Sequence, residues 1–328
     1  MPRALRSVML AAIAALLPAL AQAQTQTWPT RPVTMVVPFA AGGPMDTVGR
    51  IPQSRLSEAL AQQVVIENVG GAGGMTGAAR VAKAAPDGYQ FVLGNVGTQA
   101  VSQSIVKHPL YDAVTDFTPV ALVADLSLVL VARKDLPAAN LQEFIAYVKA
   151  NQDRVQFASA GAGSATHLGC ALLNAIIGVK VTHVPYRGGA PAMQDLVAGR
   201  VDYLCVDTPV AIPQIESGTI KAIAILTRAR SASLPQLASA HEQGLINFEA
   251  SNWAALFLPK GTPAPIVDKL AAASSAALDS PDVQKRFKDN GIDVAAPDRR
   301  SPAYLSKFLA DEITKWAGAL KAAGISPE

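Results

Sequence analysis

From residue 32 onward, two kinds of segment alternate along the chain, and they differ in the pattern of their hydrophobic and polar positions. Short runs rich in valine and isoleucine alternate with longer segments, rich in alanine and leucine, in which apolar residues recur with helical spacing. The short runs predict strands at residues 33–37, 63–67, 91–93, 128–132, 156–158, 181–184, 201–205 and 222–226. The longer segments predict helices at 45–60, 75–83, 141–150, 166–177, 190–198, 266–277, 281–290 and 302–323. This alternation is typical of an α/β protein with largely parallel sheets.

Two segments share one local arrangement, in which a strand leads through a glycine loop into a helix. They are residues 33–46, VTMVVPFAAGGPMD, and residues 155–167, VQFASAGAGSATH. Such a loop presents backbone N–H groups and the positive end of a helix dipole, which together attract anions. Neither loop contains Lys or Arg, so main-chain donors and hydroxyls such as Ser164 and Thr166 would hold the anion. The pair predicts a carboxylate site, although glycines of this kind also serve simply as tight turns.

Segments 116–125 and 248–259 are candidate crossings between two α/β units. They divide the chain into a discontinuous lobe 1, residues 24–123 and 248–328, and a lobe 2, residues 124–247. Ligands of open α/β sheets bind where the loops after the strands face each other. We therefore expect the two glycine loops to clamp a small ligand in the cleft between the lobes.

The first 23 residues have the pattern of a secretory signal peptide. Arg3 and Arg6 are followed by an apolar run at residues 8–20 and by the small-residue sequence Ala21-Gln22-Ala23. The apolar run is too short to span a bilayer, so cleavage after Ala23 and export are expected, with a retained anchor as the alternative. Without Arg3 and Arg6 the formal charge falls from +3 to +1, which does not favour a polyanionic partner such as nucleic acid.

Cys170 and Cys205 are the only cysteines of the chain. Export places them in an oxidising compartment, where a disulfide is possible. The alternative is a pair of buried free thiols, because sequence does not establish how far apart their Cα atoms lie.

Motifs for catalysis or metal binding are scarce. The chain has no G-x-S-x-G, no H-E-x-x-H and no G-x-x-x-x-G-K-[ST], and its four histidines lack the spacing of metal ligands. We therefore expect no catalytic residue, metal or cofactor. The competing hypothesis is an exported enzyme that uses His167 and Asp207 as an acid/base pair across the cleft.

Several polar residues near the loops allow both a structural and a functional interpretation. His167 begins the helix after the second loop. It is interpreted as a packing or capping partner, with a position facing the cleft as the alternative. His183 is expected in the core. Asp207 is expected first as a helix cap and second as a partner for a ligand amine or hydroxyl. Asp46 is interpreted as a helix-dipole partner before a ligand contact. Arg187 is expected to point into solvent, with assistance in anion capture as the alternative.

The order and spacing of these segments resemble the Bug family, the periplasmic solute-binding receptors of tripartite tricarboxylate transporters. The matching segments span nearly the whole mature chain: WPTRPV at 28–33, VPFAAGGPMD at 37–46, ENVGGAGG at 67–74, PDGY at 86–89, SAGAGS at 159–164 with His167, HVPYRG at 183–188 and LFLPKGTP at 256–263. The chain departs from the family at Asn68-Val69-Gly70, where Asn-Arg-Pro-Gly is common.

The resemblance implies a two-lobed periplasmic-binding-protein fold of type II, the Venus flytrap, in the periplasm. It implies a monomer that binds a small carboxylate, such as a dicarboxylate, a tricarboxylate, an aromatic acid or an amino acid, and delivers it to an inner-membrane permease without a cofactor. The ligand-binding positions carried over from the family, with one from the 94–99 loop, are Phe39, Ala40, Gly42, Gly43, Asp46, Thr98, Ala160, Gly161, Gly163, Ser164, His167 and Asp207.

Overall fold

The computed structural model describes residues 28–325. The predicted signal peptide, residues 1–23, and its cleavage site lie outside the described residues. Within residues 28–325, none of the helices combines the length and the apolar character that a bilayer crossing needs.

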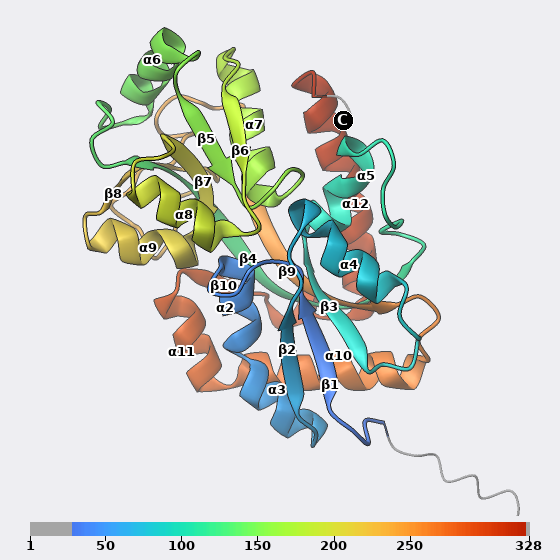
Figure 1. Cartoon of the computed structure of the whole chain (residues 1–328). Helices are drawn as coiled ribbons and strands as arrows, with labels where there is room; N and C mark the ends of the chain where they lie inside the picture. The colour runs from blue at the N-terminus through green and yellow to red at the C-terminus, as the bar shows by residue number, and fades with distance from the viewer. Residues whose placement is uncertain (1–27, 326–328) are drawn as a thin grey trace, which may run out of the picture.

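The described residues form a curved mixed sheet flanked by helices, as Figure 1 shows. The strand order is β2-β1-β3-β9-β4-β7-β5-β6, and β8 and β10 pair with β4 as well. The strands are β1 (Val33–Val37), β2 (Val64–Asn68), β3 (Gln90–Asn95), β4 (Phe117–Arg133), β5 (Gln156–Ser159), β6 (Thr182–Pro185), β7 (Tyr203–Asp207), β8 (Ile220–Ile225), β9 (Ser251–Pro259) and β10 (Ile292–Val294).

Helices cover both faces of this sheet (Figure 1). They are α2 (Pro44–Arg50), α3 (Gln53–Leu60), α4 (Met75–Ala82), α5 (Ser102–Ile105), α6 (Leu141–Asn151), α7 (Ala165–Ile177), α8 (Gly189–Val197), α9 (Thr208–Glu216), α10 (Ala264–Asp279), α11 (Pro281–Asp289) and α12 (Pro302–Ala322). Short helical turns occur at η2 (Ala72–Gly74), η3 (Val96–Val101) and η4 (Pro297–Arg299). The C-terminal helices α10 and α11 lie beside the N-terminal α3 in the lower half of Figure 1.

β4 is the element that joins the two halves of the molecule. Its 17 residues pair antiparallel with β9 and β10 along the first part and with β7 and β8 along the second. The outer pairings, of β1 with β2 and β3 and of β5 with β6 and β7, are parallel. The predicted two-lobed α/β fold is confirmed, with antiparallel strands at its centre.

The predicted crossings are strands rather than plain connections. The stretch expected as a crossing at 116–125 is the first part of β4, and the strand expected at 128–132 is only its end. The expected crossing at 248–259 contains β9. Both strands are buried along almost their whole length, so their apolar residues run continuously instead of alternating with polar ones. The predicted lobe boundary between 123 and 124 falls inside β4.

Prolines account for two differences among the helices. The single helix expected at 45–60 is divided into α2 and α3, and Pro52 is the N-cap residue of the second. A proline has no N–H to donate to the preceding turn, so it ends one helix and allows the next to begin. The unpredicted helix α9 begins with Thr208-Pro209 and contains Pro213. The sequence did not predict this helix because prolines inside a segment argue against a helix.

The C-terminal helix α12 is attached to the central strand β9 by a buried carboxylate. Both Trp253 of β9 and Trp316 of α12 donate their indole N–H to Oε2 of Glu312, at 2.9 and 3.2 Å. At the start of the helix, Ser301 caps α12 by accepting from the Tyr304 amide at 3.1 Å. Two neutral indole donors and the ion pair with Lys315, whose Nζ lies 3.1 Å from Glu312 Oε1, thus satisfy an acidic side chain in the core.

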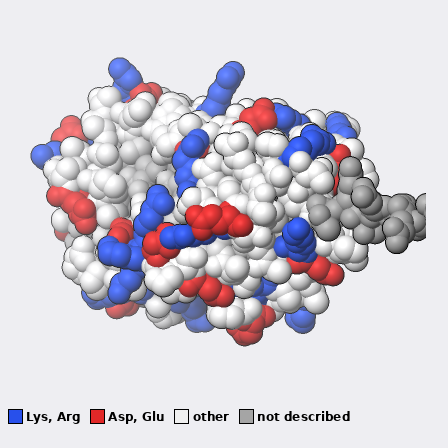
Figure 2. All heavy atoms as spheres, turned by 90° about the horizontal axis from the view of Figure 1, so that it is seen from below, with Lys and Arg blue, Asp and Glu red and all other residues white. Residues whose placement is uncertain are grey.

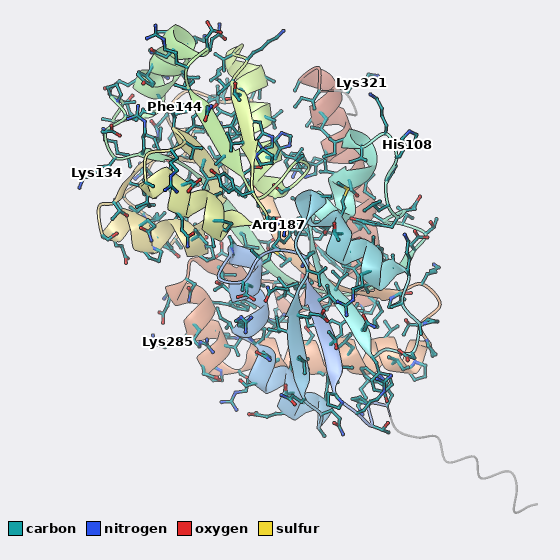
Figure 3. The ribbon with its side chains drawn as sticks, viewed as in Figure 1. His108, Lys134, Phe144, Arg187, Lys285 and Lys321 are labelled. Carbon is teal, nitrogen blue, oxygen red and sulfur yellow. A yellow bond between two sulfur atoms is a disulfide. The ribbon has the colours of Figure 1, made fainter. Side chains whose placement is uncertain are left out.

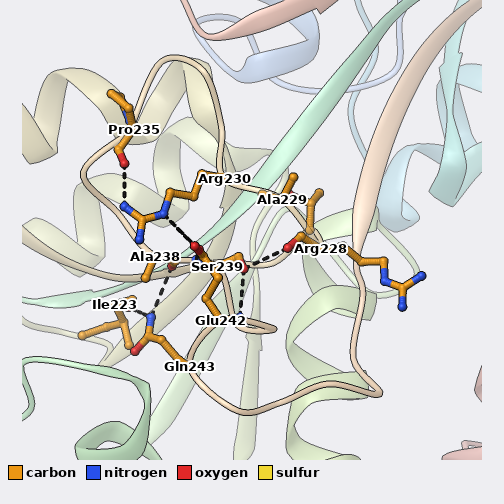
Figure 4. A network of polar contacts seen from close by, with 10 residues as sticks. Ile223, Arg228, Ala229, Arg230, Pro235, Ala238, Ser239, Glu242 and Gln243 are labelled. Atoms are coloured by element: carbon orange, nitrogen blue, oxygen red, sulfur yellow. Dashed lines mark hydrogen bonds and ion pairs between the residues drawn. The ribbon is translucent and has the colours of Figure 1, made fainter.

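The long connection from β8 to β9 is ordered by the polar network in Figure 4. Buried Ser239 donates its hydroxyl to the carbonyl of Arg228 at 2.9 Å, and its amide donates to Glu242 at 2.8 Å. Arg230 donates to both carboxylate oxygens of Glu242, each at 3.0 Å, and Gln243 donates to the carbonyl of Ile223 at 3.0 Å. The network closes the connection onto the edge of β8.

Acidic and basic side chains are interspersed on the face of the molecule that Figure 2 shows from below. Arg55 of α3 contacts Asp282 of α11 at 3.2 Å, an ion pair between the N-terminal and C-terminal segments of the lower half. Because solvent screens such an exposed pair, it contributes little to stability.

Candidate functional site

A small cavity lies where the two halves meet. Its walls come from the loop after β1, the end of β3, the loops after β5, β6 and β7, and the start of β9. The lining residues are Phe39, Pro44, Met45, Asn95, Ala160, Ser164, Ala165, Thr166, Gly189, Asp207 and Asn252.

The starts of three helices of the second half meet at this cavity. Ser164 is the N-cap residue of α7, Gly189 is the first residue of α8, and Asp207 is the N-cap residue of α9. Each start directs the positive end of a helix dipole toward the cavity, which favours an anionic ligand. Among the described residues, no Lys or Arg lines it.

Asp46 organises the first glycine loop from behind the cavity wall. Its carboxylate accepts from the Gly42 amide at 2.8 Å, from Arg50 Nε at 2.8 Å and from Asn68 Nδ2 at 2.9 Å. Burial raises the pKa of Asp46, but the hydrogen bonds from Arg50, Gly42 and Asn68 together outweigh burial and lower it. Asp46 is therefore a charged anchor of the loop, in keeping with its interpretation as a helix-start partner.

The second glycine loop is held largely by its own neighbours. The amides of Ala160 and Gly161 donate to Thr166 Oγ1 at 2.8 Å and to Ser159 Oγ at 3.0 Å. The amides of Gly163 and Ser164 donate to His167 Nδ1 at 3.2 Å and to the Gly161 carbonyl at 3.0 Å. In this conformation the four amides are therefore used within the loop itself, and ligand binding at these positions stays a prediction.

Loops that follow strands of the two halves touch each other. The Ala40 amide donates to the carbonyl of Arg187 at 3.1 Å. A Cβ added to Gly73, which follows β2, would come within 2.0 Å of the Ala162 carbonyl oxygen. A Cβ on Gly97 would lie 2.8 Å from the Gly163 carbonyl oxygen. The molecule is thus in a closed arrangement that only residues without side chains permit at these contacts.

Arg187 lies near the junction of the two halves in Figure 3. Its side chain is exposed, as expected, while its carbonyl makes the contact with Ala40. The part of this residue that joins the halves is therefore the main chain.

Asp207 is the charged group of the cavity wall. Asn252 Nδ2 donates to its Oδ1 at 2.9 Å, and both side chains are buried. Burial raises the pKa of Asp207 to about 6, opposed in part by the bond from Asn252. The expected capping role is wrong: Asp207 occupies the N-cap position of α9, but among residues 28–325 its side chain makes no capping bond to that helix.

His167 takes the packing role that was its first interpretation, whereas His183, expected in the core, is only half-buried, and Thr98 lies behind the cavity wall. The imidazole of His167 stacks on His183 with the ring centroids 4.2 Å apart, and both rings line a different, outer cavity together with Phe157. An acid/base pair of His167 and Asp207 across one cleft is therefore not formed. Thr98 is fully buried and exchanges hydrogen bonds with Asn95, so Asn95 lines the cavity and Thr98 supports it.

Of the predicted binding residues, Phe39, Ala160, Ser164 and Asp207 line the cavity. The loop residues Ala40, Gly42, Gly43, Gly161 and Gly163 lie behind its wall and shape the two turns. The lining residues that the sequence did not indicate are Pro44, Met45, Asn95, Ala165, Gly189 and Asn252. The Gly188-Gly189 pair after a predicted strand was an available signal for Gly189, whereas Asn252 sits in β9 and reaches the cavity only through the long-range pairing of β9 with β4.

Cys170 of α7 and Cys205 of β7 form a disulfide behind the second glycine loop. Their Cα atoms lie 5.5 Å apart, and 35 positions separate them in the sequence. The bond attaches the helix that starts at the cavity to the central strand of its half of the sheet.

Comparison with known proteins identifies the family. The family model described as the tripartite tricarboxylate transporter family receptor matches residues 48–325. The periplasmic binding protein BugD is 40% identical, with a TM-score of 0.89 over 92% of this chain and all of that chain. MatC from Rhodopseudomonas palustris, solved with bound malate, is 42% identical, with a TM-score of 0.87 over 89% of this chain and all of that one.

A second R. palustris protein, solved with adipate, is 34% identical, with a TM-score of 0.87 over 92% of this chain and all of that chain. These likenesses confirm the resemblance to the Bug proteins that the sequence motifs indicated. The chain is a solute-binding protein and belongs to the tripartite tricarboxylate transporter receptor family.

Proposed function

We propose that this protein captures a small dicarboxylate in the cavity between its halves, closes around it, and delivers it to an inner-membrane permease. The single observation that carries the ligand class is the meeting of the starts of α7, α8 and α9 at a cavity wall without Lys or Arg. Dipoles and hydroxyl groups then provide the attraction for a carboxylate. The malate and adipate of the two solved relatives support the same class.

Contacts with the ligand come from Phe39, Ala160, Ser164 and Asp207, joined by Asn95 and Asn252. Ala40, Gly42, Gly43, Asp46, Gly161 and Gly163 set the shape of the two turns. Closure moves lobe 1, residues 24–123 and 248–328, against lobe 2, residues 124–247. The bond from Ala40 to Arg187 and the contact of Gly73 with Ala162 form only in the closed state.

A thermal-shift titration tests the ligand class. Malate, adipate, succinate and a neutral diamide of succinate are added to purified protein that has been freed of bound ligand. A ligand that binds only the folded form raises the free energy of unfolding, by about 2.7 kcal/mol when its concentration is 100 times Kd. The Tm therefore rises with ligand concentration. A rise with one or more diacids but not with the diamide is expected. No rise with any diacid would refute the proposal.

Delivery and location need separate measurements. We expect the periplasmic fraction of cells that make the full chain to contain a protein beginning at Gln24, as read by N-terminal sequencing. Uptake of a radiolabelled diacid by vesicles carrying a tripartite tricarboxylate permease is expected to require addition of this protein. Equal uptake with and without it would refute the role in delivery.

A further inference from the structure

Asp207 is an acidic group in the wall of a cavity that the proposed function fills with an anion. The residue is 3% exposed and lies at the end of β7, and no Lys or Arg of residues 28–325 joins it in the wall. Its carboxyl has two hydrogen-bond donors, Nδ2 of Asn252 at 2.9 Å and its own main-chain amide. An ionised Asp207 and the carboxylates of a ligand would therefore share one site with no cation in its wall.

Asn252 is fixed in one orientation at this contact. Its Oδ1 accepts from the main-chain amide of Trp253 at 2.9 Å, so its NH2 group has to face Asp207. An NH2 group can donate both to a carboxylate and to the carbonyl oxygen of a carboxylic acid. Oδ1 of Asp207 is thus the acceptor in either form, and a proton on this carboxyl belongs on Oδ2, the oxygen that Asn252 does not contact.

Burial, and not a neighbouring charge, sets the properties of Asp207. Burial raises its pKa to about 6 against the hydrogen bonds from Asn252 and from its own amide, and no charged group is among the causes. In the ligand-free protein the carboxyl is therefore ionised at pH 7 and neutral below pH 5.

The titratable side chains on the elements around β7 and α9 lie outside the cavity wall. These side chains are Asp46 and Arg50 of α2, Asp125 and Arg133 of β4, His167 of α7, Asp195 of α8, Tyr203 of β7 and Lys221 of β8. Glu216 of α9 lines another cavity together with Lys288, Asp289 and Asp293. Asp207 is thus the titratable group that a ligand in the cavity meets among the described residues.

We propose that Asp207 takes up a proton when a dicarboxylate enters the cavity, and that the neutral carboxyl then donates from Oδ2 to an oxygen of the ligand. The proton comes from the buffer: an O–H bond forms at Asp207, and the buffer acid loses one proton. An ionised Asp207 would repel a ligand carboxylate strongly in the low dielectric of the site, whereas a neutral carboxyl is a hydrogen-bond donor. This inference rests on the proposed function, because it requires a diacid in this cavity.

Proton uptake makes the affinity depend on pH. Between pH 7 and pH 8 the free carboxyl is ionised, so each diacid that binds has to bring about one proton with it. The Kd of the wild type is therefore expected to rise by about tenfold over this interval. Below pH 5 the carboxyl is already neutral, and binding takes up no proton at Asp207.

Isothermal titration calorimetry counts the protons. Malate is added at pH 7.5 in phosphate and in Tris, whose ionisation enthalpies differ, and the difference in heat gives the number of protons taken up per malate. We expect about one for the wild type and for the control D311N, which changes an exposed residue of α12, and none for D207N. Binding by the wild type without uptake, or equal uptake by D207N, would overturn the proposal.

The affinity of D207N provides a second readout. Its amide can accept from Asn252 through Oδ1 and donate to the ligand through Nδ2, as the neutral acid does. The Kd of D207N is expected to stay constant from pH 7 to pH 8, while the Kd values of the wild type and D311N rise together. Because all three proteins bind malate, titration of the ligand cancels in the comparison. A parallel rise in D207N would contradict the proposal.

Infrared difference spectra determine which group carries the proton. A neutral carboxylic acid has a C=O stretching band that a carboxylate lacks. On binding of malate at pH 7.5, this band is expected to appear in the wild type and to be missing in D207N. Malate labelled with 13C at both carboxyl groups shifts the band only when the ligand carries the proton, and such a shift would overturn the assignment to Asp207.

A variant of Asn252 separates the hydrogen bond from the carboxyl itself. N252A removes a donor that lowers the pKa of Asp207, so more of the carboxyl is neutral before the ligand binds. Proton uptake per malate at pH 6.5 is therefore expected to be smaller in N252A than in the wild type, and equal uptake would contradict the proposal.

The outcomes distinguish this inference from the function on which it rests. If malate, succinate and adipate bind neither the wild type nor D207N between pH 5.5 and pH 8, the proposed function fails and this inference fails with it. If a diacid binds and no proton is taken up, the function stands and only the proton uptake is refuted.

Discussion

Asn252 of β9 and Asp207 at the end of β7 meet in the wall of the cavity, with 2.9 Å between Asn252 Nδ2 and Asp207 Oδ1. Their strands both pair with β4, so β4 fixes the distance between the two side chains. The hydrogen bond from Asn252 offsets part of the free-energy cost of burying the charged carboxylate. Burial is the larger effect, so the pKa of Asp207 rises to about 6.

The raised pKa predicts how stability depends on pH. A carboxyl with a higher pKa in the folded protein stabilises the fold below its unfolded pKa, near 3.8, and this stability is lost as pH rises through 6. A shift of about two units corresponds to about 3 kcal/mol. We therefore expect D207N to raise Tm by several degrees at pH 7.5 and by much less at pH 4.5, measured by calorimetry. An equal Tm difference at both pH values would contradict this.

The pKa of Asp46 shifts in the opposite direction, so its effect on stability depends on pH in the opposite way. Hydrogen bonds lower its pKa in the folded protein, so its stabilising contribution is present above pH 4 and is lost as pH falls below it. D46N is expected to lower the free energy of unfolding at pH 7 by about 1.5–3 kcal/mol, the range for hydrogen bonds to a charged group. Urea unfolding measures the change. The matched control is D311N, which breaks an exposed pair with Lys307 and should leave the free energy of unfolding nearly unchanged. Equal losses in D46N and D311N would refute the prediction.

The contact of Gly73 with Ala162 predicts a variant that folds but does not close. A methyl group at Gly73 would lie 2.0 Å from the Ala162 carbonyl oxygen, so G73A should hold the halves apart. We expect at least a tenfold rise in Kd for the bound diacid and loss of ligand-induced compaction in X-ray scattering.

Gly218 supplies the control for G73A. Its φ of +64° nearly equals the +63° of Gly73, and no described atom lies within 4 Å of an added Cβ. G218A therefore introduces the same backbone strain, about 1 kcal/mol, without the clash. Equal affinities of G73A and G218A would show that the contact is not part of closure.

The disulfide is expected to stabilise the second half. A closed loop of about 35 residues contributes about 3–4 kcal/mol in the chain-entropy model. The double variant C170A/C205A should therefore unfold at lower urea concentration than the oxidised wild type. Dithiothreitol should shift the wild type toward the variant and leave the variant unchanged. A wild type unaffected by complete reduction would contradict the expectation.

Local patterns predicted the elements well where a single segment determines its own structure. The strand at Val33–Val37 and the helices that end near Gly178 and Gly291 follow from hydrophobic period and left-handed glycine caps. The central strands were harder, because β4 and β9 are buried on both faces and their apolar runs resemble connections between lobes as much as strands.

The site was predictable only in part, for a similar reason. Loop positions such as Phe39 and Ser164 follow from the motif itself, but Asn252 reaches the cavity through strand pairing between distant segments. The direction of a side chain within a helical turn also escapes sequence patterns. His167 is in the turn that was predicted, yet its ring faces outward because Gly163 and His183 hold it there.

Because β4 is shared by both halves, the chain cannot be cut into two independently expressed fragments at residue 123 without exposing a severed hydrophobic edge prone to aggregation. Anyone converting this receptor into a biosensor should therefore leave β4 intact and insert the reporter domain at an exposed turn such as Gly218 or Gly261, where an added group meets no described neighbour.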